Sequence, residues 1–134
     1  MQNILYVLLA VFSIGCVSNK IPEPSQNKKE FHKINDRYTF TIKEILSDSR
    51  CPKDVQCVWE GQVEVVITFY ENERFLKEEL IVLNTKNFEK NRSILEQYTL
   101  NKKISRIQIF PEKIQNKEIE LKDYFLEITV EGQD

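Results

Sequence analysis

The sequence contains few of the residues from which helices and catalytic sites are commonly built. Its 134 residues include one alanine, one histidine, one tryptophan, one methionine and three glycines. Alanine is the strongest helix former, so its near absence beside many isoleucines and valines favours strands over helices. The lone histidine, His32, has no cysteine near it in the sequence, and no glycine-rich phosphate loop or nucleophile elbow is present. The composition therefore predicts a non-catalytic β protein without a metal or another cofactor.

The charges are almost balanced. Lysine and arginine number 19 and aspartate and glutamate 21, for a formal net charge of −2. Proteins that bind nucleic acid usually carry a clear basic excess. Nucleic acid is therefore not an expected partner.

The N-terminal segment is apolar and carries no charge before Lys20. Its apolar length of about 14 residues would span ~21 Å as a helix, which is short of the ~30 Å hydrocarbon core of a membrane. The run ends in Ser-Ile-Gly-Cys, which resembles a lipobox, the processing signal of bacterial lipoproteins. We predict a signal peptide over residues 1–15 and lipid attachment at Cys16; the alternative is an uncleaved membrane helix.

Residues 16–36 follow as a polar stretch with two prolines and little hydrophobic periodicity. This composition is typical of a flexible tether. The predicted organisation is thus a lipidated tether followed by a folded domain over residues 37–134. Such a protein belongs to the bacterial cell envelope, anchored in the outer membrane or facing the periplasm.

Two further cysteines, Cys51 and Cys57, enclose five residues in the chemically densest stretch of the chain, residues 48–61. Their spacing allows a disulfide or a pair of thiols for a metal or a redox partner. Thiols in an exported protein usually oxidise and persist as disulfides, so we predict a Cys51–Cys57 bridge. A loop this short adds only about 2 kcal/mol to stability, so the bridge shapes the loop more than it stabilises the domain.

Trp59 and Gly61 follow the second cysteine. In an extended segment Trp59 lies on the same side as Cys57, so its indole is expected to pack over the bridge. Gly61 is expected to provide a positive φ or a close backbone approach before the next strand.

The charged residues of this stretch allow two interpretations. Arg50 can stack on Trp59 or pair with Asp48 or Asp54, which would make it structural. The functional alternative is a presented recognition surface formed by Arg50, Asp54, Gln56 and Trp59.

The string Asp-Ser-Arg-Cys-Pro, then Cys-x-Trp-x-Gly, and the later Ile109-Phe110-Pro111 resemble a group of small, largely uncharacterised bacterial lipoproteins and secreted β-rich domains. The resemblance covers the chain from Tyr38 to Val130. It implies an envelope β-sandwich and supplies no catalytic residues.

Alternating apolar and polar residues after position 37 predict about six strands. The strand after Gly61, with Val63, Val65, Ile67 and Phe69 on one face, is expected in the middle of a sheet. Residues 71–74 are expected to form a hairpin, and residues 84–93 a long loop, with a helical turn over 87–95 as the alternative. The remaining strands are expected over 38–46, 75–83 with Leu76, Leu80 and Val82 inward, 94–100, 104–110 with a bulge near Ser105, and 124–130.

These strands predict an all-β fold, a small antiparallel two-sheet β-sandwich that is loosely immunoglobulin-like, with a small barrel as the alternative. The predicted function is a lipid-anchored envelope module that binds another protein or a polysaccharide. One alternative is a protease inhibitor or immunity protein that presents the Cys51–Cys57 loop. The other is an envelope protein that uses these cysteines for thiol redox chemistry or metal binding.

Overall fold

The computed structural model describes residues 31–100 and 102–132. The predicted signal peptide, Cys16 and most of the predicted tether lie outside these ranges. The described part contains one α-helix, two 3-10 turns and six strands: β1 (His32–Lys33), β2 (Tyr38–Asp48), β3 (Val63–Glu71), β4 (Arg74–Leu83), η1 (Thr85–Asn87), α1 (Phe88–Glu96), β5 (Ile104–Phe110), η2 (Leu121–Asp123) and β6 (Phe125–Val130).

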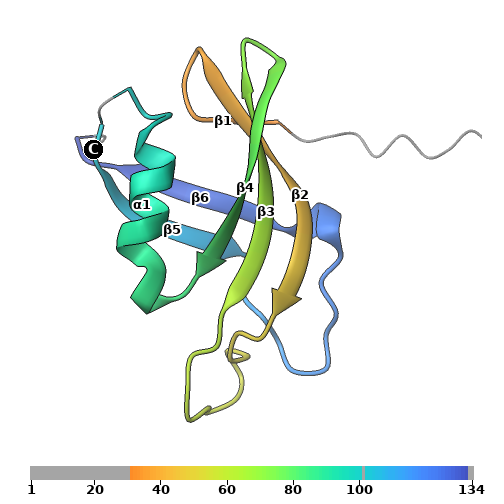
Figure 1. Cartoon of the computed structure of the whole chain (residues 1–134). Helices are drawn as coiled ribbons and strands as arrows, with labels where there is room; N and C mark the ends of the chain where they lie inside the picture. The colour runs from red at the N-terminus through yellow and green to blue at the C-terminus, as the bar shows by residue number, and fades with distance from the viewer. Residues whose placement is uncertain (1–30, 101, 133–134) are drawn as a thin grey trace, which may run out of the picture.

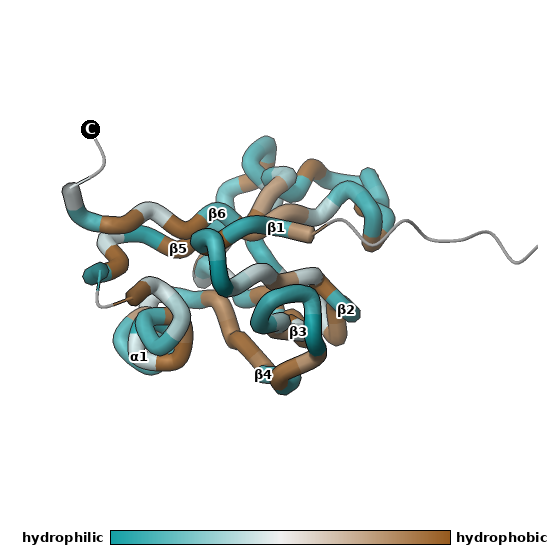
Figure 2. Tube along the Cα trace, turned by 90° about the horizontal axis from the view of Figure 1, so that it is seen from above, coloured by the Kyte–Doolittle hydropathy of each residue, from teal (hydrophilic) through white to brown (hydrophobic). Residues whose placement is uncertain are grey.

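The strands form two antiparallel sheets, one ordered β1-β2-β3-β4 and the other β5-β6. Seen from the front, the two-stranded sheet runs across the back of β2, β3 and β4 (Figure 1). Seen from above, the two sheets form separate layers, with α1 beside β4 (Figure 2). The structure confirms the predicted all-β fold with two antiparallel sheets, and β3 lies between β2 and β4 as expected.

The core fills the space between the sheets. Val63, Val65, Ile67 and Phe69 on one face of β3 are all fully buried, as their alternation predicted. The ring of Phe69 stacks on Tyr98 with their centroids 4.1 Å apart. Each large apolar side chain buried here contributes about 1.5–3 kcal/mol to folding. The second sheet contributes Ile104, Ile109 and Leu126 to the same core.

The β3–β4 hairpin turns at Asn72 and Glu73, which both have positive φ, 48° and 67°. A two-residue turn in which both residues have positive φ twists in the same sense as the strands on either side, so it is favoured in hairpins. The hairpin predicted over residues 71–74 is therefore confirmed.

The predicted inward face of β4 is wrong. Leu76 and Leu80 are 40% and 46% exposed, whereas Ile81 is fully buried. Tyr70 pairs with Phe75 but Phe69 pairs with Lys77, which leaves Leu76 as an extra residue in the strand. Such a one-residue bulge moves every later side chain to the opposite face. Without it the predicted residues would have faced the core.

The helix α1 replaces the loop expected over residues 84–93 and the strand expected over 94–100. The helical alternative over residues 87–95 was nearer to the structure. The Asn84 side chain accepts a hydrogen bond from the Asn87 amide (2.8 Å) and caps η1, which leads into the helix. Asn91 and Leu95, four residues apart, face inward, and Asn91 donates to the Val82 carbonyl of β4 (2.8 Å). Because a polar residue takes one of the two buried positions, hydrophobic periodicity did not reveal the helix.

Residues 31–36, expected in the tether, are part of the fold. The short strand β1 pairs with β2, and the His32 ring stacks on Phe40 with centroids 5.0 Å apart. Phe31 meets Tyr70 edge to face at 5.2 Å. The folded domain therefore includes residue 31, rather than beginning at residue 37.

Candidate functional site

The loop between β2 and β3, residues 49–62, projects beyond the end of the four-stranded sheet (Figure 1). The sulfurs of Cys51 and Cys57 lie at disulfide distance, 2.15 Å, with the Cα atoms 5.9 Å apart, as predicted. The bridge closes the outer part of the loop on itself.

The base of this loop continues the β2–β3 pairing. The Ser49 amide donates to the Gln62 carbonyl (2.8 Å), and the Cys51 amide donates to the Glu60 carbonyl (2.9 Å). Gly61 has a φ of +71°, and a Cβ there would lie 1.9 Å from the Ser49 carbonyl oxygen. Only glycine fits this conformation and this approach, as expected for Gly61.

Arg50 is a structural residue rather than part of a presented surface. Its Nε and Nη2 donate to the Asp48 carboxylate over 3.0 and 2.7 Å, and its Nη1 donates to the Ile109 carbonyl over 2.9 Å. The side chains of Arg50 and Asp48 are only 18% and 9% exposed. Of the partners predicted for Arg50, the structure selects Asp48, which agrees with the structural interpretation of this residue.

Burial and hydrogen bonding act in opposite directions on Asp48. Burial alone would raise the pKa of this carboxyl, but hydrogen bonds from Arg50 and from the Tyr124 hydroxyl outweigh it and hold the pKa below its usual value. The carboxylate is thus charged and bonded to two elements, which ties the end of β2 to the start of β6.

Asp54 also fastens the loop instead of presenting it. Its Oδ1 accepts a hydrogen bond from the Gln115 amide (2.9 Å). Next to it, the Lys53 amide donates to the Lys113 carbonyl (2.9 Å), and Lys113 Nζ donates to the Asp48 carbonyl (2.6 Å). These bonds hold the first half of the loop on residues 111–117.

The second half of the loop ends in an exposed tip, residues 55–59, called the tip below. Val58 is 95% and Trp59 80% exposed, and Val55 and Gln56 are exposed as well. The expectation that the indole packs over the bridge is therefore wrong. The chain bends at residues 58 and 59, so the alternation of an extended segment does not hold there.

A side-chain clamp holds the far side of the tip. Glu60 Oε1 accepts hydrogen bonds from the Thr85 amide (3.0 Å) and the Thr85 hydroxyl (2.7 Å). These bonds lower the pKa of Glu60 below its ordinary value. With the Cys51–Cys57 bridge on one side and this clamp on the other, Val58 and Trp59 are presented between two fastened points.

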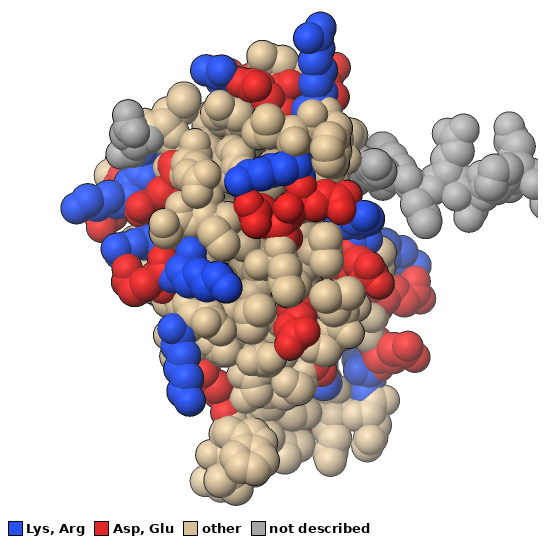
Figure 3. Space-filling model, in the orientation of Figure 1, with Lys and Arg blue, Asp and Glu red and all other residues tan. Residues whose placement is uncertain are grey.

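No residue of the tip carries a charged side chain. The charged side chains next to the tip are paired within the protein: Lys53 lies 3.4 Å from Glu112, and Asp54 and Glu60 accept the hydrogen bonds described above. In the space-filling view, the lowest part of the molecule, where the loop projects, shows uncharged atoms (Figure 3). The tip is therefore an uncharged, largely apolar knob.

A groove of about 750 Å³ begins at the base of this loop. Leu83, Phe88, Ile107 and Ile109 supply its apolar lining, and Cys51, Glu60 and Gly61 border it on the side of the loop. The groove therefore lies between the ends of β4 and β5, below the first turn of α1.

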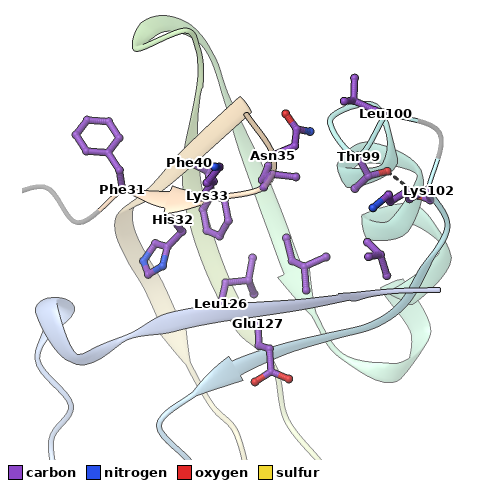
Figure 4. Close-up of a pocket in the computed structure, with 13 residues that line it drawn as sticks. Phe31, His32, Lys33, Asn35, Phe40, Thr99, Leu100, Lys102, Leu126 and Glu127 are labelled. Atoms are coloured by element: carbon purple, nitrogen blue, oxygen red, sulfur yellow. Dashed lines mark hydrogen bonds between the residues drawn. The ribbon is translucent and has the colours of Figure 1, made fainter. Parts of the chain in front are cut away.

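A second cavity of about 520 Å³ opens between β1 and β6 (Figure 4). Phe40 and Leu126 lie toward it, whereas Glu127 points to the opposite side of β6. Lys33 at its rim is paired with Asp36 over 2.7 Å, and the His32 ring rests on Phe40. At this cavity the core is open to the surface, and the side chains that line it bring no reactive groups together.

Within residues 31–100 and 102–132, no three His, Cys, Asp or Glu side chains are grouped to hold a metal ion. In the same ranges, no helix has the length and apolar character needed to cross a membrane. Comparison of the chain with protein-family models, with curated proteins and with solved structures found no match. The fold and the site define a small two-sheet β protein with a braced apolar loop, and the resemblance to envelope lipoproteins stays a prediction.

Of the predicted surface residues, the structure presents Gln56 and Trp59 and uses Arg50 and Asp54 as anchors. Sequence reasoning missed Val58, the most exposed large apolar residue of the described chain. The signal was an apolar pair, Val58 and Trp59, inside an otherwise polar loop next to a cysteine.

Proposed function

We propose that the chain is a non-catalytic binding module of the bacterial cell envelope, held by lipid on Cys16, that docks on another envelope protein through the tip. The observation that supports this most directly is the exposure of Val58 and Trp59, 95% and 80%, on a loop fastened on both sides.

Tryptophan is the residue most often found at the energetic centre of protein interfaces. An indole buries about 150–250 Å² in a contact, so covering Trp59 together with Val58 is worth roughly 5 kcal/mol before entropic costs. The bridge and the Glu60–Thr85 clamp reduce those costs because the loop is already ordered.

The uncharged tip favours a protein over a polysaccharide. Sugars stack on aromatic rings but also need several hydrogen-bonding side chains around the ring, and besides the indole the tip presents only the Gln56 amide. Asp54 and Glu60, the acidic residues nearest Trp59 in the chain, are both bonded to other parts of the molecule. An apolar pocket on a protein fits the tip better.

The position of the tip favours a partner away from the anchoring membrane. The described chain enters at β1, which pairs with Thr39 and Phe40 at the start of β2, whereas the loop leaves after Asp48 at its end. Strand β2 has 11 residues. At ~3.3 Å per residue such a strand spans roughly 35 Å, so the tip lies at the opposite end of the sheet from the entry of the chain.

Photo-crosslinking on the full chain in cells tests this proposal. A photoreactive residue in place of Val58 should yield one discrete crosslinked protein, and Trp59→Ser should abolish it. The matched control is the same residue in place of Glu73, exposed at the β3–β4 turn at the far end of β3. Equal crosslinking from both positions would count against docking through the tip.

Cys16→Ser should release the chain into the soluble fraction, and its retention in membranes would argue against the lipid anchor.

An inhibitor or immunity protein is the second candidate, because a braced and uncharged tip also fits the apolar cleft of an enzyme. In that case the crosslinked partner is an enzyme, and the purified chain lowers its activity. The Trp59→Ser variant should relieve this inhibition at least tenfold. Undiminished activity of the captured enzyme in the presence of excess chain removes this candidate.

A further inference from the structure

We infer that the docking surface has a second part, the free edge of β5, where an extended segment of the partner protein adds as a further strand. This inference rests on the proposed function and names how the partner is held next to the tip.

The hydrogen bond from Arg50 to the Ile109 carbonyl shows which way β5 faces. This carbonyl accepts from Arg50 (2.9 Å), so it points away from β6. The N–H and C=O of one strand residue point to the same side, and successive residues alternate. Ile109 and Ile107 therefore direct their main-chain groups away from β6, whereas those of Gln108 and Phe110 are directed toward their partners in the register, Glu127 and Phe125.

Three main-chain groups are left for a new strand. Arg50 occupies the Ile109 carbonyl, and by the same alternation the Ile109 N–H and the N–H and C=O of Ile107 also point away from β6. In the described ranges β5 pairs with β6 alone. An extended segment that pairs with an exposed strand edge satisfies such groups, which is a common mode of peptide recognition.

The groove supplies the space and the side-chain contacts. Ile107 and Ile109 line it, and Leu83 at the end of β4 and Phe88 at the start of α1 form the facing wall. Its volume of about 750 Å³ lies within the range of natural binding sites. The two charged side chains that line it are already bonded, Arg50 to Asp48 and Glu60 to Thr85. An uncharged, β-branched segment is therefore the occupant that fits.

The tip alone is too small for a stable complex. A standard interface buries about 800 Å² on each partner, whereas one indole and two valines supply roughly 300–400 Å². The groove begins at Cys51, Glu60 and Gly61, the residues at the base of the tip, so one partner can cover both without a break. The free edge of β5 and the groove beside it can therefore supply the remaining contact area that a stable complex needs.

The test uses the full chain in detergent micelles and, as probe, twelve-residue peptides selected on it from a phage-displayed library. In the free chain, the amides of Ile107 and Ile109 should exchange with deuterium faster than those of Gln108 and Phe110. The selected peptide should slow exchange at Ile107 and Ile109. N-methylation of the peptide amide that donates to the Ile107 carbonyl should weaken binding up to about tenfold, while methylation of its two neighbouring amides, which point away from β5, changes little.

Two tests separate this inference from the proposed function. Phe88→Ser removes one wall of the groove and should weaken peptide binding several-fold, whereas the matched control Phe75→Ser, at an exposed residue that does not line the groove, should leave it unchanged. Equal crosslinking from positions 58 and 73 together with intact peptide binding would refute docking through the tip and leave the strand addition standing.

Several outcomes overturn the strand addition. The first is that selected peptides leave exchange at Ile107 and Ile109 unchanged. The second is that both methylated forms bind equally, and the third is that Phe88→Ser binds the peptide as well as the unaltered chain does. Protection of the same amides by self-association, or by phosphatidylglycerol vesicles without peptide, would instead identify a second copy or a membrane as the occupant.

Discussion

The hydroxyl of Tyr124 donates a hydrogen bond to Asp48 Oδ2 over 2.9 Å and so joins the two sheets at the foot of the projecting loop. Tyr124→Phe should lower the free energy of unfolding by about 1–2 kcal/mol, because the buried carboxylate loses one donor. Urea denaturation measures the loss. Tyr38→Phe is the matched control, since its hydroxyl lies 3.4 Å from Glu71, and it should cost less than half as much. Equal losses would show that the Tyr124 hydroxyl has no special role.

The same carboxylate predicts a loss of stability in acid. The pKa of Asp48 lies below its ordinary value of 3.8 in the folded chain, so its contribution is complete above that value. It is lost as the pH falls through the lower, folded pKa, because the unfolded chain then binds the proton more readily. Unfolding measured from pH 5 to pH 2 should show this fall, and Asp48→Asn should remove part of it. An unchanged acid dependence in Asp48→Asn would contradict the assignment.

Gly61→Ala should be severely destabilising. The new Cβ would lie 1.9 Å from the Ser49 carbonyl oxygen, and φ is +71°. We expect a loss of at least about 3 kcal/mol, combining the clash with the left-handed backbone. Gly132→Ala is the control, because φ is +85° there but no atom lies within 4 Å, so about 1 kcal/mol is expected. Similar melting temperatures for the two variants would refute the close approach at Gly61.

Trp59→Ser should leave stability almost unchanged. The indole is 80% exposed, and exposed side chains without partners change the free energy of unfolding by about 0.5 kcal/mol or less. Phe69→Ala, at a fully buried position, should cost about 3–5 kcal/mol in the same experiment. A loss above 2 kcal/mol for Trp59→Ser would place the indole in the core and remove the main support for docking.

Removing the bridge should loosen the tip more than it destabilises the fold. The double variant Cys51→Ser and Cys57→Ser should lose about 2 kcal/mol, because the closed loop is short. Crosslinking from position 58 should fall, because a tip without the bridge is less ordered and loses more conformational entropy on binding. Thiol titration of the exported wild-type chain should find both cysteines blocked. Free thiols, or a bound metal, would favour the redox or metal alternative.

Local patterns in the sequence were sufficient for the features that depend on near neighbours. The alternation of Val63, Val65, Ile67 and Phe69 placed β3 in the middle of a sheet, and the four polar residues after it placed the hairpin. Gly61 was recognised because few other residues tolerate a tight corner. The cysteine spacing and the predicted signal peptide together indicated the bridge.

Features that depend on distant partners were not readable in this way. Periodicity cannot show a bulge, and the extra residue at Leu76 reversed the inner face of β4. The helix α1 escaped notice because its buried polar residue, Asn91, has its partner on another element, the Val82 carbonyl of β4.

The sequence by itself determined that this chain forms strands, pairs Cys51 with Cys57 and turns sharply at Gly61, because side-chain alternation, loop closure and φ are local properties. Only the tertiary structure decided that Arg50 faces inward and Trp59 outward. That choice follows from Asp48, Ile109 and Tyr124 surrounding the guanidinium of Arg50, while the indole of Trp59 stays 80% exposed.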